Sequence, residues 1–307
     1  MPEATLNKPM KIEKPRSQWR DVWIQFRKHK GAMVGMAVLT LLVLFVVIGP
    51  MVWHPPQMTT TQMLLSKNKP PSWTFPLGTD HLGRDFLTRL MMGGRVSIAV
   101  GFVAMMISLF VGTTIGTLAG FFPRLDGPLM RLTDLFLALP LLPLLLVLMM
   151  LFRDTLARAF GVEMGTFLLI VMAIGVTSWM QSARVVRGEV LALKEREFVL
   201  AARSIGTPPR RMILRHVLPN VISPVMVAAT LNIADAIITE SVLSFLGLGF
   251  PPDFPTWGRL LFDGLPYLQQ FPERALWPGA LISLTVLSVN YIGDGLRDAL
   301  DPRIRGR

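Results

Sequence analysis

The sequence predicts an all-α, polytopic membrane protein with six transmembrane helices, and three observations carry that prediction. Of its 307 residues, 51% are hydrophobic and only 17% are charged, whereas a soluble domain carries about 25% charged residues. The mean hydropathy is +0.49. Six apolar stretches each approach the roughly 20 residues that a helix needs to cross a bilayer. Because backbone polar groups in lipid must be satisfied within the segment, these stretches are expected to be helices.

The predicted spans follow one another with no long polar domain between them. They are expected at residues 31–52, 96–122, 132–152, 164–183, 217–238 and 275–293. The predicted organisation is a lead with an interfacial helix (1–30), a first span with an outer loop (31–94), a transmembrane core (95–296) that contains a polar loop at 184–216, and a tail (297–307).

The segment before the first span has an aromatic and basic pattern. Trp19, Trp23 and Phe26 lie at helical spacing beside cations. This pattern fits a helix in the membrane interface, and it fits equally a continuation of the first span beyond the bilayer.

The basic residues are explained by topology. A net charge of +11 would suggest a nucleic-acid partner in a soluble protein. Here most Lys and Arg lie at span ends, on the side that is inside if both termini are cytoplasmic, so the positive-inside rule accounts for them without nucleic acid. The exceptions lie in the first outer loop: Lys67, Lys69, Arg84, Arg89 and Arg95. Asp80 and Asp85 partly offset these cations, and their helical spacing from Arg84 and Arg89 favours ion pairs that hold the outer segment together.

The sequence contains none of the patterns that would make it an enzyme. It has no cysteine, which excludes disulfides, thiolate metal sites and a cysteine nucleophile. His29, His54, His81 and His216 are scattered, without metal-ligand spacing. There is no phosphate-binding loop and no dinucleotide or hydrolase motif. We therefore expect no catalytic residues, no metal and no cofactor, and a membrane enzyme is the weakest reading.

The polar loop at 184–216 contains a short amphipathic helix. Phe198, Ala201, Ala202 and Ile205 fall on one helical face. Gly206 follows as a C-terminal stop, and prolines at 208 and 209 prevent continuation. The pattern fits an apolar knob that docks in a groove on a cytoplasmic partner, or a helix that lies on the membrane surface.

Glycine spacing predicts close helix packing. Gly112, Gly116 and Gly120 recur every fourth residue, as do Gly31 and Gly35. Such spacing places the glycines on one helix face and lets a neighbouring helix approach closely.

Four segments resemble one family in the right order. Residues 201–206 and 218–220 resemble the EAA loop of bacterial ABC importer permeases, although Leu200 stands where that loop has Glu, with Glu197 three residues earlier. That departure is itself similar to the oligopeptide and dipeptide branch. Segments 77–97, 245–261 and 293–303 resemble the C-type subunit of the dipeptide, oligopeptide and nickel permeases.

The resemblance implies a specific assembly in the bacterial inner membrane. The fold would be that of a type I importer permease, paired as a heterodimer with a second permease subunit, with two ATP-binding subunits and an extracytoplasmic solute-binding protein. The short loop helix would seat in one ATPase. The residues expected at that contact are Glu197, Phe198, Ala201, Ala202, Arg203 and Gly206. The solute would be a peptide or a related small molecule, and the alternative is a secondary transporter that works without ATP.

Polar residues on the last two spans are candidates for the translocation path. They are Asn232, Asp235, Glu240 and Asn290, because ionisable groups within a membrane point to function. Asp235 and Glu240 lie near the outer end, where they could instead face water or the partner chain. Pro219 and Pro224 are expected to break the start of the fifth helix.

Overall fold

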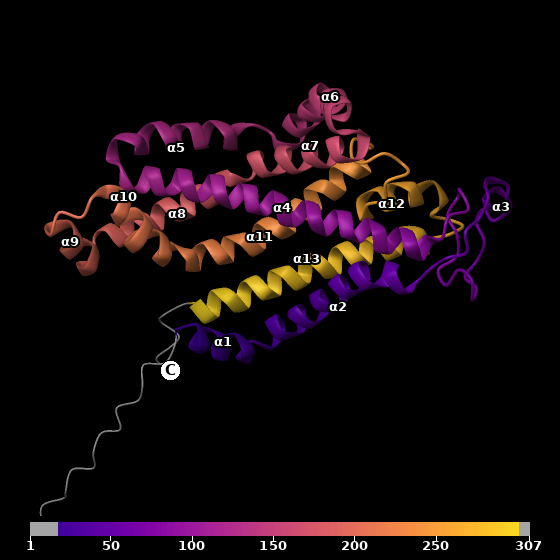
Figure 1. Ribbon diagram of the computed structural model, residues 1–307, viewed down its shortest axis with the longest axis horizontal. Coiled ribbons are helices and arrows are strands. Elements are labelled where there is room, and N and C mark those ends of the chain that lie inside the picture. Colours follow the sequence, from indigo (N-terminus) through magenta and orange to yellow (C-terminus); the bar gives the residue numbers. More distant parts are fainter. Residues whose placement is uncertain (1–17, 301–307) are drawn as a thin grey trace, which may run out of the picture.

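The computed structural model describes residues 18–300, and this part of the chain is almost entirely helical (Figure 1). The first 17 residues of the predicted lead (1–30) and the last seven residues of the tail lie outside the described residues. The elements are α1 Gln18–Lys28, α2 Lys30–Val52, α3 Thr60–Leu65, α4 Phe86–Phe121, α5 Pro123–Ala138, α6 Leu141–Phe160, α7 Val162–Thr177, α8 Trp179–Lys194, α9 Glu197–Ser204, α10 Pro209–Met212, π-helical η1 Ile213–Val217, α11 Leu218–Phe245, α12 Trp257–Gly264, 3-10 helical η2 Leu265–Tyr267 and α13 Glu273–Leu300.

The all-helical membrane fold is confirmed. Five segments are long and apolar enough to cross a bilayer: Lys30–Val52, Phe86–Phe121, Val162–Lys194, Pro209–Phe245 and Glu273–Leu300. A sixth crossing is present if α5 and α6, which are bent by 87° relative to each other, count as one span. The long helices form one elongated bundle, with α9 at one end and α3 at the other (Figure 1).

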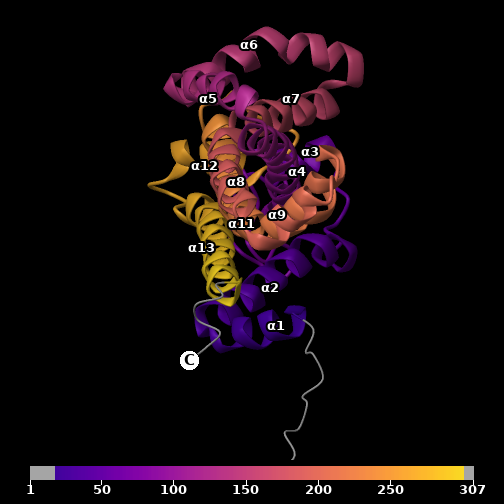
Figure 2. The same cartoon turned by 90° about the vertical axis from the view of Figure 1, so that its left-hand side faces the viewer.

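The third predicted span, 132–152, is wrong as a straight helix. Leu139 adopts φ −75° and ψ 134° between α5 and α6. The residue before a proline is pushed away from helical backbone, and Pro140 follows directly. Figure 2, viewed from the α9 end, shows α6 running across the bundle above α5 and α7.

One predicted boundary and one predicted helix break also differ from the structure. The boundary expected at 94/95 falls inside α4, because the helix begins at Phe86, where the Asp85 carboxylate accepts a hydrogen bond from the Thr88 amide at 3.1 Å. The fifth helix is not broken by its prolines. Pro219 lies in the first turn of α11, directly after the π-helical turn η1, and Pro224 lies within the continuous helix.

The glycine spacing predicted the packing of α4 correctly. Gly112, Gly116 and Gly120 all face α8. A Cβ added at these three positions would lie 2.8, 2.5 and 3.0 Å from the carbonyl oxygens of Trp179, Ala183 and Arg187. Gly35 approaches α13 in the same way, with the carbonyl oxygen of Ser288 at 2.7 Å from an added Cβ. Two helix pairs are therefore in backbone contact, as small-residue spacing permits.

The segment before the first span is a separate helix. His29 has extended backbone between α1 and α2, and its Nδ1 accepts a hydrogen bond from the Ala32 amide at 3.0 Å. Val22 and Phe26 of α1 are buried with Ala32 and Ala299. Packing on α2 and α13 thus holds α1, and the continuation of the first span is wrong.

Candidate functional site

The loop helix α9 lies at the end of the bundle remote from α3 and α12 (Figure 1). Gly206 ends it with φ +77°, a conformation that glycine adopts without strain. The Thr207 amide donates to the Ala202 carbonyl at 3.1 Å, and the Gly206 amide donates to the Arg203 carbonyl at 3.0 Å. This pair of bonds is the Schellman motif, and the predicted stop at Gly206 is confirmed.

The predicted outward apolar face of α9 is wrong at Ala202 and agrees with the structure at its other three residues. Phe198 is 44% exposed, Ile205 is 83% exposed and Ala201 is also exposed. Ala202 instead is buried with Val199 and Met212, with Phe121 packed against them. The inward face of an eight-residue helix is thus set by Val199 and Ala202, three residues apart, while Glu197 and Arg203 are exposed.

A lysine and an arginine connect the helix before this loop to the bundle. Lys194 Nζ donates to the carbonyl oxygens of Gly120 and Phe121, at 3.1 and 3.3 Å. Those carbonyls are at the C-terminal end of α4, where helix carbonyls lack internal partners. Arg187 of α8 forms a two-bond pair with Asp126 of α5, at 2.5 and 2.7 Å. α8, the helix that leads into α9, is thereby fixed to α4 and α5.

Two of the four path candidates share a cavity. A cavity of about 330 Å³ lies between α5, α6, α8 and α11, and both Asn232 and Asp235 line it, together with Gln181 and Thr239. Asn232 Nδ2 also donates to Ser182 Oγ at 2.9 Å. Polar groups from two helices therefore converge on a cavity whose other walls are mostly apolar.

The other two candidates lie elsewhere. Glu240 is fully buried, so it faces neither water nor a partner surface, and it does not line the cavity. Its carboxylate accepts hydrogen bonds from Ser97 Oγ at 3.0 Å and from Ser244 Oγ at 2.7 Å. Asn290 is half-buried on α13 and does not line that cavity either. Sequence position alone could not separate these two from Asn232 and Asp235.

Sequence reasoning missed a junction around Ser97. Ser97 Oγ accepts a hydrogen bond from the Trp257 amide at 3.2 Å while it donates to Glu240. Trp257 is fully buried, and its Nε1 donates to the Leu90 carbonyl at 2.9 Å. α4, α11 and α12 therefore meet at one set of buried hydrogen bonds.

Arg95 connects α4 to α2 beside this junction. Its Nε donates to the Val46 carbonyl and an Nη donates to the Val47 carbonyl, both at 2.6 Å. Pro50 lies four residues after Val46 within α2 and has no N–H, so the Val46 carbonyl lacks its usual helical donor. The signal available in the sequence was a proline within an apolar span, which leaves the carbonyl four residues earlier without its helical donor.

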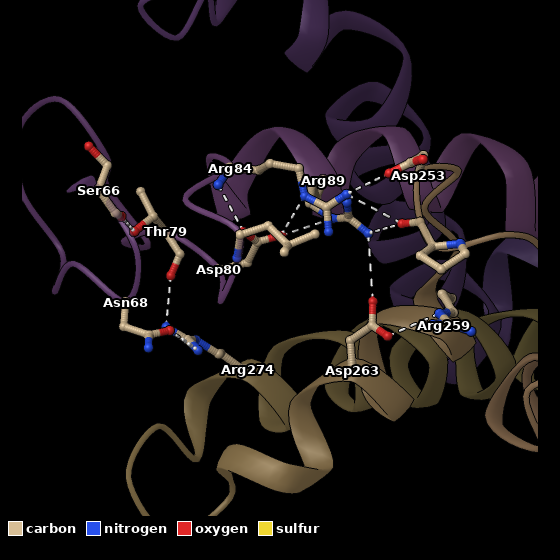
Figure 3. Close-up of polar contacts among 12 residues, drawn as sticks. Ser66, Asn68, Thr79, Asp80, Arg84, Arg89, Asp253, Arg259, Asp263 and Arg274 are labelled. Carbon is tan, nitrogen blue, oxygen red and sulfur yellow. Dashed lines mark hydrogen bonds and ion pairs between the residues drawn. The ribbon is translucent and has the colours of Figure 1, made fainter. Parts of the chain in front are cut away.

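The opposite end carries a cap, residues 54–85 and 246–272, held by ion pairs (Figure 3). Asp80 pairs with Arg84 at 2.7 Å and with Arg89 at 3.7 Å. Arg89 also reaches Asp263 of α12 at 3.8 Å. The predicted ion pairs are confirmed for Asp80, Arg84 and Arg89. Asp85 differs, because its carboxylate accepts from Trp53 Nε1 at 2.8 Å and from Thr88.

Two aromatic contacts complete the cap. The His81 ring stacks on Tyr267 with a centroid distance of 5.6 Å. Burial lowers the pKa of His81 below its ordinary value, against the opposing effects of Asp80 and Asp263. The guanidinium of Arg274 lies 4.2 Å from the centre of the Phe271 ring.

Within residues 18–300 no group of three or more His, Cys, Asp or Glu could hold a metal ion.

A polytopic helical bundle with a cavity that polar groups from two helices line in part, a projecting helix at one end and a bonded cap at the other is the architecture of a membrane transport subunit. The chain belongs to the family described as binding-protein-dependent transport system inner membrane component, whose model matches residues 112–306. The model described as the N-terminal TM domain of oligopeptide transport permease C matches residues 17–71.

Several curated proteins are similar to this chain. The oligopeptide transport system permease protein OppC of Bacillus subtilis is 39% identical over 95% of this chain and 92% of its own length. The dipeptide transport system permease protein DppC of the same organism is 40% identical over 94% and 87%. Among solved structures, a chain of an amino acid ABC transporter crystallised with histidines aligns with a TM-score of 0.49 and 17% identity, over 69% of this chain and 92% of that chain.

Membership of this family confirms the resemblance drawn from the sequence. The chain is a permease component of an ATP-driven, binding-protein-dependent importer of the bacterial inner membrane. It works with an ATPase and with a substrate-binding protein.

Proposed function

We propose that this chain forms half of the translocation path of a peptide importer, as one permease of a heterodimer that binds two ATPase subunits. The curated relatives are named for oligopeptide and dipeptide transport, which supports peptides as the solute. In this proposal both termini and α9 lie in the cytoplasm, and the cap faces outside.

The observation that carries the proposal is the outward face of α9. Phe198, Ala201 and Ile205 are exposed on a helix whose inner side is fixed by Val199 and Ala202. An apolar, rigidly presented helix face fits a groove on a soluble partner. Phe198 and Ala201 make the contact, while Glu197 and Arg203 lie at its rim. Ala202 has a positioning role from the inner side, and Gly206 ends the helix.

Force from the ATPase would reach the spans through the inner side of α9. Val199 and Ala202 pack with Met212, which leads into η1 and α11, and with Phe121, the last residue of α4. Movement of α9 would thus act on the ends of two spans at once. Closure of the ATPases biases a two-state bundle in this way.

The path itself is proposed to include the cavity between α5, α6, α8 and α11. Asn232 and Asp235 would present an amide and a carboxylate to a passing peptide, whose ammonium and backbone groups need such partners in a membrane. Glu240 and Asn290 lie outside this cavity, and the contacts of Glu240 support a bracing role.

Co-isolation tests the coupling contact. We expect Phe198→Glu and Ala201→Glu to abolish co-purification of the ATPase subunits, because each places a charge in an apolar contact. Leu214→Glu is the control, since Leu214 is 56% exposed in η1, outside α9. Retention of the ATPase by both α9 variants would contradict the proposed contact. Full-speed uptake by vesicles that contain no ATPase would favour the secondary transporter.

A further inference from the structure

The most exposed large apolar side chain of the described residues lies in the cap. Trp73 is 100% exposed, in the non-helical segment between α3 and α4. Most other exposed large apolar residues lie on the long helices, where lipid or a partner chain covers them. A tryptophan that buries about 150–250 Å² on contact is a large exposed surface to leave in water. Its position therefore requires an occupant.

The segment that carries Trp73 is a bonded hairpin. At its tip the Ser72 amide donates to the Phe75 carbonyl at 2.9 Å, and the Phe75 amide donates to the Ser72 carbonyl at 3.1 Å. At its base the Thr79 amide donates to the Lys69 carbonyl at 3.1 Å, and the Lys69 amide donates to Thr79 Oγ1 at 2.9 Å. Phe75 is buried 94% into the cap, since only 6% of it is exposed. The backbone on either side of Trp73 is thus fixed, and the tryptophan side chain is exposed to solvent.

The base of this hairpin is fixed to α13 at the cost of backbone strain. Asn68 has φ +56°, the only positive value at a non-glycine position in the described residues. Arg274 donates to Asn68 Oδ1 and to the Thr79 carbonyl, both at 2.8 Å (Figure 3). Strained backbone persists where surrounding contacts over-determine it, and such positions cluster at binding sites. The hairpin is therefore preorganised, which reduces the entropy that binding must overcome.

The charges beside Trp73 are unusual for this side of the protein. The cations of the first outer loop include three arginines with partners: Arg84 pairs with Asp80, Arg89 with Asp80 and Asp263, and Arg95 with two carbonyls. Lys67 and Lys69 are exposed, and neither has an ion pair within residues 18–300. Lys and Arg are less frequent in outer loops than in cytoplasmic loops. Two lysines without an ion pair in the described residues, four and six positions before an exposed tryptophan in the sequence, therefore favour a complementary acidic surface.

We propose that the hairpin of residues 67–79 is a docking anchor for the solute-binding protein. Trp73 enters an apolar notch on that protein, and Lys67 and Lys69, from the base of the hairpin, pair with carboxylates on the same protein. A lipid surface needs no defined geometry for partition, whereas a fixed hairpin matches one specific protein surface. Figure 1 shows the α3 region extending past the ends of α4 and α13, away from the sides of the bundle. This inference rests on the proposed function, which places the cap outside.

A fluorescent label tests which occupant covers Trp73. The chain has no cysteine, so Thr74→Cys, at the exposed position directly after Trp73, introduces a unique labelling position in this subunit and keeps the tryptophan. The assembled transporter is reconstituted in vesicles with an environment-sensitive dye at this position, and the complex without the substitution is labelled in parallel. We expect a blue shift of the emission on addition of the solute-binding protein. A blue-shifted emission in vesicles without that protein would assign the site to lipid or to the second permease subunit and would overturn the proposal, as would the absence of a shift in either case.

Affinity measurements complete the test. We expect Trp73→Ala to lower the affinity of the transporter for the solute-binding protein about tenfold or more, as truncation of a tryptophan hot spot does. The double variant Lys67→Glu and Lys69→Glu should also lower this affinity, and the loss should be larger at low salt than at high salt. Leu268→Ala is the control, because Leu268 is 47% exposed in the cap but has no neighbouring lysine. If the variants keep their ATPases and their affinity for the solute-binding protein is unchanged, the docking proposal is wrong and the proposed function stands. If the unsubstituted complex does not hold ATPases, the proposed function is wrong.

Discussion

At the cap end, single arginines bridge separate segments of chain, whereas at the other end α9 contacts the bundle mainly through small apolar side chains. Arg89 reaches Asp80, Asp263 and the Pro252 carbonyl, and it is 95% buried, since only 5% of it is exposed. The inner contact of α9 consists of Val199, Ala202 and Met212. The cap is thus cross-linked by directional bonds, and α9 is held by a small non-directional contact.

This difference indicates different mechanical roles. Local stability follows the number of buried contacts and bonds that must break together. Loop 66–80 and α12 of the cap share one set of polar bonds with the adjoining ends of α4 and α13, so these parts are expected to move as one body. The short contact under α9 can be repacked at lower cost, which suits an element that receives force from a moving partner.

The largest expected effect comes from Arg89→Leu. The substitution removes a buried cation that lies near two carboxylates, and breaking a buried pair costs roughly 3–5 kcal/mol. Arg84 and Arg259 still neutralise Asp80 and Asp263, so we expect the low end of that range. The measurement is the unfolding temperature of the purified complex. Arg158→Leu, at an exposed position of α6, is the control, and equal unfolding temperatures for the two variants would remove the contrast between the ends.

A second, smaller effect is expected at the junction beneath the cap. Glu240→Leu leaves the hydroxyls of Ser97 and Ser244 without their acceptor, and an unsatisfied buried group costs about 1–3 kcal/mol. Glu240→Gln keeps a polar partner for both, so it should lower the unfolding temperature less. Proteolysis of the 246–256 segment should report the loosening of α12. Equal stability of the two variants would show that the junction contributes nothing to fixing the cap.

The sequence predicted features that depend on neighbours along one helix. Hydropathy located the spans, and four-residue glycine spacing located the α4–α8 contact, because both are properties of a single helix. The bend at Leu139 was also signalled locally, by the proline that follows it. The ion pairs of Asp80 were predicted for the same reason, since Arg84 and Arg89 are close in the sequence.

Contacts between distant segments were out of reach. Ala202 was expected to face outward because Phe198 and Ile205 lie near it on the helical wheel, but Val199, Met212 and Phe121 define the inner side. Glu240 reads as a path residue until Ser97, more than 140 positions earlier, is seen to donate to it. Hydropathy and periodicity carry no information about which distant hydroxyl meets a given carboxylate.

The smallest expected effect on stability lies at the end of α9. Gly206→Ala forces a Cβ into the left-handed conformation at about 1–2 kcal/mol, and because nothing packs within 4 Å of this position, the cost falls on the turn alone. We expect the α9 terminus to fray, transport per ATP hydrolysed to fall, and the unfolding temperature of the complex to stay unchanged. Gly188→Ala is the matched control, since Gly188 also has open space around it but lies within helix α8 without a positive φ. If Gly206→Ala destabilised the whole complex as Arg89→Leu does, α9 would be as firmly integrated as the cap, and the contrast between the two ends would be wrong.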